Sequence, residues 1–118
     1  MSNSLTAIIP ILNEEGFLAE SVNRLLQVEE ISEVFLVDDC STDNSLKIMK
    51  KIESENKRVK VFESPHPTNR GKGDTILRAR EYIKSNYVVI HDADLEYNPQ
   101  DIRKLFNSIK ENQETFLI

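Results

Sequence analysis

Short apolar runs alternate with amphipathic stretches along this 118-residue chain. The apolar runs predict strands over residues 5–11, 33–38, 59–62 and 87–91. The stretches between and after them repeat apolar residues at helical spacing, which predicts helices over residues 16–28, 44–56, 73–85 and 98–109. Because the strands are apolar on both faces, we expect an α/β fold with a doubly wound, mostly parallel sheet and helices on both faces.

A polar cluster follows three of the four predicted strands. In sequence order the clusters are Asn13-Glu14-Glu15, Asp38-Asp39 and Asp92-Ala93-Asp94. The carboxyl ends of parallel strands lie along one edge of a sheet, and ligands bind at that edge in open α/β folds. We therefore expect the three clusters to meet in one binding site.

Asp92 and Asp94 are spaced i, i+2 at the end of the fourth predicted strand. In an extended backbone this spacing places both carboxylates on one face, where they repel each other unless a cation lies between them. Glu96 adds a third oxygen donor, and such hard ligands suit Mg²⁺ or Mn²⁺. A metal held by few protein ligands usually also holds a phosphate or diphosphate. The alternative is that these carboxylates cap the next helix or line a solvated turn.

The segment after the second predicted strand carries both ligand-binding and turn chemistry. Asp39 is placed to accept hydrogen bonds from a nucleobase or a ribose, whereas Ser41, Thr42 and Asp43 are good helix N-caps. We expect Thr42 or Asp43 to cap the next helix while an aspartate faces the ligand.

The NRGKG run at residues 69–73 precedes the third predicted helix. Gly71 and Gly73 allow a close approach of the backbone to a ligand, and a helix N-terminus with Lys72 favours an anion such as phosphate. The spacing is not that of a P-loop, and a flexible loop before a helix is the alternative.

Composition narrows the class of protein further. A net charge of −5 argues against general nucleic-acid binding, which needs a basic face. No apolar run approaches the roughly 20 residues of a membrane-spanning helix. The single cysteine, Cys40, cannot form an internal disulfide, which is compatible with a reducing, cytoplasmic location. His66 and His91 lack the spacing of a zinc site.

Four motifs together resemble glycosyltransferase family 2, the A-type nucleotide-sugar transferases. They are IPILNEE at residues 9–15, VDDCSTD at 37–43, NRGKG at 69–73 and DADLEYNP at 92–99. The last motif is especially similar to the dolichyl- and polyprenyl-phosphate sugar transferase branch. The sequence departs from the family pattern at Cys40, where glycine is usual, and at Glu96, where glutamine is common in that branch.

The resemblance implies the Rossmann-like nucleotide-binding half of an A-type fold and a role for individual residues. Val37 and Asp39 would hold the base, and Lys72 would lie near the phosphates. The implied nucleotide-sugar-binding set is Pro10, Leu12, Asn13, Glu14, Val37, Asp39, Gly71, Lys72, Asp92 and Ala93. The implied metal ligands are Asp94, Asp92 and Glu96, with Mg²⁺ or Mn²⁺ bound.

The implied reaction is metal-dependent, inverting transfer of a sugar from a nucleotide-diphospho-sugar to an acceptor hydroxyl or a polyprenyl phosphate. We expect residues 1–118 to be the donor-binding part of a domain truncated inside a strand that opens at residue 115. The catalytic base would then lie beyond residue 118, and the fragment would transfer no sugar by itself. Self-association through an uncovered sheet surface, and a location peripheral to the membrane for the longer protein, are further expectations.

Three other classes of protein remain as alternatives. A phospho-receiver domain has a similar length and an acidic pair, but its pair follows the first strand rather than the second. A non-catalytic nucleotide-binding module would share the fold and lack the reaction. A sugar nucleotidyltransferase would need a glycine-rich, arginine-containing loop where this chain has Asn13-Glu14-Glu15.

Overall fold

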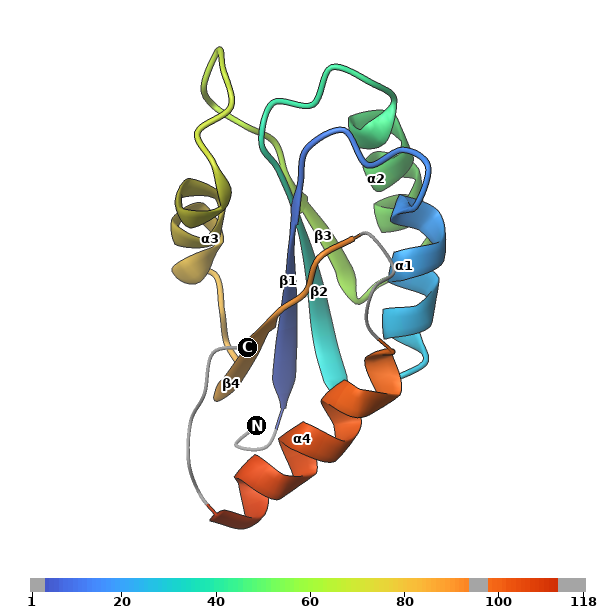
Figure 1. Ribbon diagram of the computed structural model, residues 1–118, viewed down its shortest axis with the longest axis vertical. Coiled ribbons are helices and arrows are strands. Elements are labelled where there is room, and N and C mark those ends of the chain that lie inside the picture. The colour runs from blue at the N-terminus through green and yellow to red at the C-terminus, as the bar shows by residue number, and fades with distance from the viewer. Residues whose placement is uncertain (1–3, 94–97, 113–118) are drawn as a thin grey trace.

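The computed structural model describes residues 4–93 and 98–112 of the chain (Figure 1). Its elements, in order, are β1 (Leu5–Ile11), α1 (Leu18–Leu26), β2 (Ile31–Asp38), α2 (Ser45–Glu55), β3 (Val59–Phe62), α3 (Lys72–Arg80), β4 (Tyr87–Ile90) and α4 (Pro99–Asn112). The predicted alternation of strand and helix is confirmed. The strand predicted to open at residue 115 lies outside the described residues.

The four strands form one parallel sheet in the order β3-β2-β1-β4. The chain moves outward from β1 to β3 and then returns to add β4 on the other side of β1. This reversal makes a switch point between β1 and β4, where open α/β sheets bind ligands beyond the carboxyl ends of the strands.

Pro10 lies where β1 and β4 part. The two strands pair only as far as Ile8 and Ile90, and the Ile8 carbonyl still accepts the His91 N–H at 2.9 Å. Residues two apart in a strand direct their main-chain N–H and C=O groups to the same side, so the main chain of Pro10, like that of Ile8, is directed toward β4. Proline has no N–H to donate there. The proline therefore stands at the point where β1 no longer needs a partner strand on this side.

The two faces of the sheet are covered unequally. Figure 1 shows α1 and α2 on one side of the sheet and α3 on the other. Alternate residues of β1 and β2 pack against α1, α2 and α4 in the larger cluster, which includes Leu25, Met49 and Phe106. The opposite face carries a small cluster of Ile8, Phe35, Val37 and Ala79 beneath α3. The prediction of helices on both faces is confirmed, and self-association through the less covered face stays a prediction.

The element bounds differ from the predicted ones at several ends, and two of these differences have a visible cause. β2 begins at Ile31 rather than residue 33, because Ile31 pairs with Leu5 although Ser32 and Glu33 interrupt the apolar run. α3 ends at Arg80 rather than residue 85. The N–H groups of Tyr82 and Ile83 bond three residues back, which tightens the last turn and ends the α-helix.

The start of α4 agrees with its predicted signal. Asn98 precedes Pro99, the first helical residue, and the Asn98 side-chain oxygen accepts the N–H of Gln100 at 2.9 Å. Among the described residues, no helix is long and apolar enough to cross a membrane.

Candidate functional site

Asn13 joins the loop after β1 to the loop after β2. Its backbone is left-handed, with φ at 54°, a conformation that asparagine tolerates better than most residues. Its side-chain oxygen accepts the N–H groups of Thr42 at 2.7 Å and Asp43 at 3.2 Å, and its own N–H donates to the Ser41 hydroxyl. These contacts hold the two loops at a fixed separation beyond the strand ends.

Asn44 occupies the N-cap position of α2, but the neighbouring Asp43, one of the two predicted caps, binds the first N–H of the helix. Its carboxylate accepts the N–H of Ser45, the first residue of α2, at 2.8 Å, and that of Glu15 at 3.2 Å. Burial by itself would raise the pKa of Asp43. Hydrogen bonds from the Ser45 side chain and from the Ser45 and Glu15 N–H groups outweigh that effect and hold the pKa below its ordinary value.

Asp39 fixes the start of α3. Its side chain is nearly buried, with 4% of the residue exposed. One carboxylate oxygen accepts the Arg70 N–H at 2.7 Å, and the other accepts the Gly71 N–H at 2.8 Å. Gly71 has φ at 92°, a conformation that favours glycine, and α3 begins at the next residue. Asp39 therefore sets where the first turn of α3 lies relative to the end of β2.

Asp38 stabilises the turn at Cys40. Cys40 has a left-handed backbone, with φ at 67°, which explains why a glycine would suit this position. The Asp38 carboxylate accepts the N–H groups of Cys40 at 3.2 Å and Ser41 at 3.1 Å. These bonds offset part of the strain of a residue that has a Cβ.

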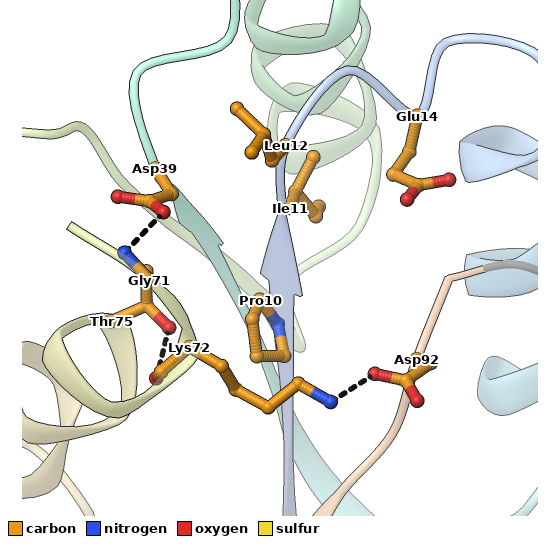
Figure 2. Close-up of a pocket in the computed structure, with 9 residues that line it drawn as sticks. All are labelled: Pro10, Ile11, Leu12, Glu14, Asp39, Gly71, Lys72, Thr75 and Asp92. Carbon is orange, nitrogen blue, oxygen red and sulfur yellow. Dashed lines mark hydrogen bonds and ion pairs between the residues drawn. The ribbon is translucent and has the colours of Figure 1, made fainter. Parts of the chain in front are cut away.

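The carboxyl ends of β1 and β2, the start of α3 and the residue two positions beyond β4 enclose a hollow of about 210 Å³, shown in Figure 2. The lining residues predicted from the sequence are Pro10, Leu12, Glu14, Asp39, Gly71, Lys72 and Asp92. The prediction that the polar clusters meet at one edge of the sheet agrees with this geometry. The lining also includes Ile11 and Thr75, which were not among the residues predicted from the sequence.

Three predicted residues lie elsewhere. Val37 is fully buried in the cluster beneath α3, and Ala93 is buried in the larger cluster on the other face. Asn13 lines a second hollow of about 280 Å³, which shares Leu12 with the first. Its other lining residues are Cys40, Thr42, Pro67, Thr68 and Asn69. Direct ligand contacts by Val37, Ala93 and Asn13 stay predictions.

Lys72 and Asp92 form an ion pair across the mouth of the first hollow. The Lys72 side chain runs past Pro10 and its ammonium lies 2.7 Å from the Asp92 carboxylate (Figure 2). About half of each side chain is exposed, so the pair contributes little to stability. Both groups are therefore free to exchange partners with a charged ligand.

The lining of this hollow is acidic. Glu14, Asp39 and Asp92 contribute three carboxylates, and Lys72 contributes one ammonium group. In the described part of the chain, no three His, Cys, Asp or Glu side chains are grouped so as to hold a metal ion. Asp94 and Glu96, the other predicted metal ligands, lie outside the described residues, so only Asp92 of the predicted set is seen in place.

The fold and the hollow define the class of protein. The parallel sheet has a switch point beside β1 and a polar hollow at its carboxyl edge, and Gly71 precedes the helix that borders this hollow. These three features are typical of α/β domains that bind phosphorylated ligands. The acidic pair follows β2, which is not its place in a phospho-receiver.

Comparison with known proteins identifies the family. The sequence model of glycosyl transferase family 2 matches residues 6–118, and the chain belongs to that family. The chain is 32% identical over 124 residues to a UDP-N-acetylglucosamine–dolichyl-phosphate N-acetylglucosaminyltransferase of Methanococcus voltae. That match covers 94% of this chain and 49% of the relative. The chain is also 31% identical over 111 residues to the uncharacterized glycosyltransferase YkcC of Bacillus subtilis, and this match covers 91% of the chain and 34% of YkcC.

The fold is shared with solved glycosyltransferase structures. Residues 1–349 of TarS from S. aureus, crystallised in complex with UDP-GlcNAc, align with a TM-score of 0.77 and 28% identity. That alignment covers 93% of this chain and 32% of the TarS chain. The predictions of the family, the A-type fold and the glycosyltransferase class are therefore confirmed. The chain spans between a third and a half of the length of the two relatives named above.

Proposed function

We propose that this chain is the part of a glycosyltransferase that binds a nucleotide-diphospho-sugar, and that the donor occupies the hollow beside Pro10. The observation that carries this proposal is the Lys72–Asp92 pair at the switch point, with Gly71 and the start of α3 at its side. An ammonium group and a helix N-terminus both attract a diphosphate.

Individual residues have separate tasks in this proposal. Lys72 would leave Asp92 and turn to the diphosphate, and Asp92 would then face the sugar or a bound cation. Leu12 and Pro10 would pack against the nucleoside, and Asp39 would keep Gly71 and Lys72 in place through its two bonds to main-chain N–H groups. Glu14 would accept a hydrogen bond from the nucleoside.

The charge of the hollow supports a role for a divalent cation. A diphosphate added to three carboxylates and one ammonium group is repelled unless further positive charge enters with it. Asp92, Asp94 and Glu96 would hold Mg²⁺ or Mn²⁺, whose oxygen preferences they satisfy. Such an ion would neutralise the charge that builds on the departing diphosphate.

The acceptor is proposed by class. The family resemblance and the name of the Methanococcus relative both support a polyprenyl-type phosphate, and a saccharide hydroxyl is the alternative. We propose inversion at the anomeric carbon. We also propose a cytoplasmic site of action, with which the single cysteine is compatible.

Calorimetric titration of the chain with UDP-, GDP- and dTDP-sugars, each with and without Mn²⁺, tests the proposal. We expect metal-dependent binding of one of the three, and its loss in Asp92→Asn. Asp101→Asn is the matched control, because Asp101 is an exposed aspartate in the first turn of α4. Equal binding by Asp92→Asn and wild type, or no binding of any of the three sugars, would overturn the proposal.

A further inference from the structure

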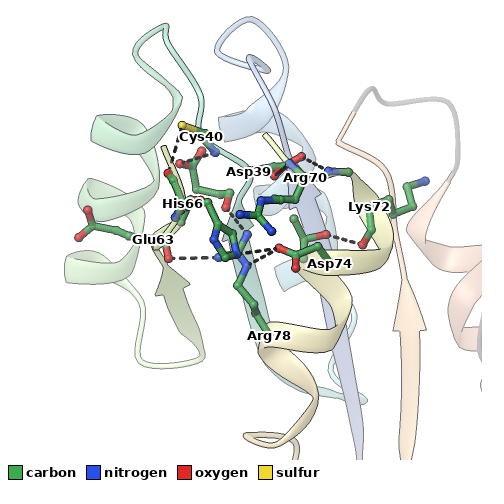
Figure 3. A network of polar contacts seen from close by, with 12 residues as sticks. Asp39, Cys40, Glu63, His66, Arg70, Lys72, Asp74 and Arg78 are labelled. Atoms are coloured by element: carbon green, nitrogen blue, oxygen red, sulfur yellow. Dashed lines mark hydrogen bonds and ion pairs between the residues drawn. The ribbon is translucent and has the colours of Figure 1, made fainter. Parts of the chain in front are cut away.

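Arg78 lies in the second half of α3, outside the hollow (Figure 3). Its side chain nevertheless connects three segments of the chain. Its side chain is only 15% exposed. The guanidinium donates to the Asp38 carbonyl at 2.6 Å, to the Glu63 carbonyl at 3.1 Å and to the Asp74 carboxylate at 3.2 Å. One side chain therefore links α3 to the ends of β2 and β3.

The two carbonyls lie at informative places in the chain. Asp38 is the last residue of β2 and directly precedes Asp39. Glu63 directly follows β3 and leads into the segment that ends at Gly71. Because the guanidinium is planar and rigid, its contacts with both carbonyls fix the distance and the direction between α3 and these strand ends.

α3 has little other support on this face of the sheet. Ala79 is its only member of the small buried cluster among the described residues, and Leu77 is exposed. The apolar interface between α3 and the sheet is therefore small, and polar contacts at the ends of β2 and β3 help to keep the helix in position.

The first turns of α3 reach the hollow. Gly71, Lys72 and Thr75 line it, and Asp39 binds the Arg70 and Gly71 N–H groups from the end of β2. A shift of α3 relative to β2 would move Lys72 away from Asp92 and would lengthen the bonds from Asp39. Arg78 is thus the contact behind the side of the hollow that carries Lys72.

We propose that Arg78 is a positioning residue for the donor diphosphate that acts through Lys72, whose place at the start of α3 also depends on the Asp39 contacts with Arg70 and Gly71. This inference rests on the proposed function of the hollow. The alternative is that Arg78 only stabilises the fold, as Arg58 does at the other end of the sheet, where its guanidinium donates to the Leu26, Val28 and Ile31 carbonyls.

The experiment compares Arg78→Gln and Arg78→Lys with Arg80→Gln, a substitution of an exposed arginine two residues further along the same helix. Binding of UDP, GDP and dTDP, each with Mn²⁺, is measured by calorimetry, and thermal unfolding shows that each variant is folded. We expect Arg78→Gln to weaken binding about tenfold, the lower end of the loss seen when an orienting contact behind a metal site is removed. Arg78→Lys should recover part of the loss, and Arg80→Gln should bind as wild type does.

A double-mutant comparison separates positioning from general destabilisation. If Arg78 acts through Lys72, the loss caused by Arg78→Gln should shrink to less than about twofold in a Lys72→Ala background, because coupled residues are not additive. Wild-type affinity in a folded Arg78→Gln variant would overturn the inference. The same loss in both backgrounds would also overturn it, since Arg78 would then act independently of Lys72.

Amide hydrogen exchange gives a readout that needs no ligand. We expect the Arg70 and Gly71 amides to exchange faster in Arg78→Gln, or in Arg78→Lys if the glutamine variant does not fold, and to be unchanged in Arg80→Gln. Unchanged exchange in a folded Arg78 variant would overturn the inference. If wild type binds none of the three nucleotides, the proposed function fails, while the exchange result still decides whether Arg78 positions the start of α3.

Discussion

The two ends of the sheet are held together by different means. At the amino end, Arg58 donates to carbonyls of Leu26, Val28 and Ile31, which joins the end of α1 to the start of β2. At the carboxyl end, side chains of one loop bind main-chain groups of another, as Asn13 and Asp39 do. Both hollows described above lie at the carboxyl end.

This difference separates stability from binding. Arg58 bonds to three main-chain carbonyls, and its neighbours Ile31 and Val59 are buried. The carboxyl end keeps the Lys72–Asp92 ion pair partly exposed, while the loops beneath it are fixed by hydrogen bonds. A ligand can therefore replace the exposed pair without disturbing the supports of the sheet.

Arg58→Ala should have the largest effect, and it should act on stability alone. Removing the guanidinium takes the side-chain donor away from three partly buried carbonyls, which should lower the free energy of unfolding by about 3 kcal/mol. Urea unfolding measures the change, and Lys57→Ala, a substitution of an exposed neighbour, is the control. A decrease in the free energy of unfolding of less than about 1 kcal/mol would contradict the view that Arg58 stabilises the amino end of the sheet.

Asn13 supports the carboxyl end, and its replacement should have an intermediate effect. Asn13→Gly loses the side-chain bonds to Thr42 and Asp43 but keeps the left-handed backbone without strain. Asn13→Ala loses both, so it should be less stable than Asn13→Gly by about 1 kcal/mol in urea unfolding. Equal stability of the two variants would mean that φ at Asn13 is not constrained by the surrounding loops.

Asp43 should give the smallest effect, and it should depend on pH. Its folded pKa is lowered, so its contribution to stability is present above the ordinary aspartate pKa and is lost as the pH falls through the folded value. Wild type should therefore be more stable than Asp43→Asn near neutral pH, and the difference should narrow on acidification. Urea midpoints between about pH 6 and about pH 3 measure it. A difference that does not change with pH would contradict the assignment.

Much of the fold was predictable from local pattern. β1 and β3 have the predicted bounds because apolar residues fill each run and polar residues or turns limit it. The start of β2 was missed because it depends on pairing between Ile31 and the distant Leu5. The end of α3 was missed because the apolar spacing does not show where bonds to residues three positions back replace the α-helical ones.

The site was predictable as a meeting of strand ends, but its internal contacts were not. Parallel strands bring their carboxyl ends together, which placed Asp39 near Lys72 and Asp92. The partners of Asp39 lie 31 and 32 residues away in the sequence, and no local pattern indicates them. The roles of Arg58 and Arg78 were not predicted either, because their partners are also distant in sequence. An arginine in a helix or beside a strand is also usually exposed.

The most direct test of the central claim is to map donor binding onto both ends of the sheet by amide NMR. UDP-N-acetylglucosamine, GDP-mannose and dTDP-glucose, each with Mg²⁺, are titrated into the ¹⁵N-labelled chain. We predict that one of them shifts the amides of Leu12, Gly71 and Thr75 at the carboxyl end and leaves those of Ile31, Arg58 and Val59 unchanged. Shifts concentrated at the amino end, or no shifts with any of the three nucleotide sugars, would contradict the account.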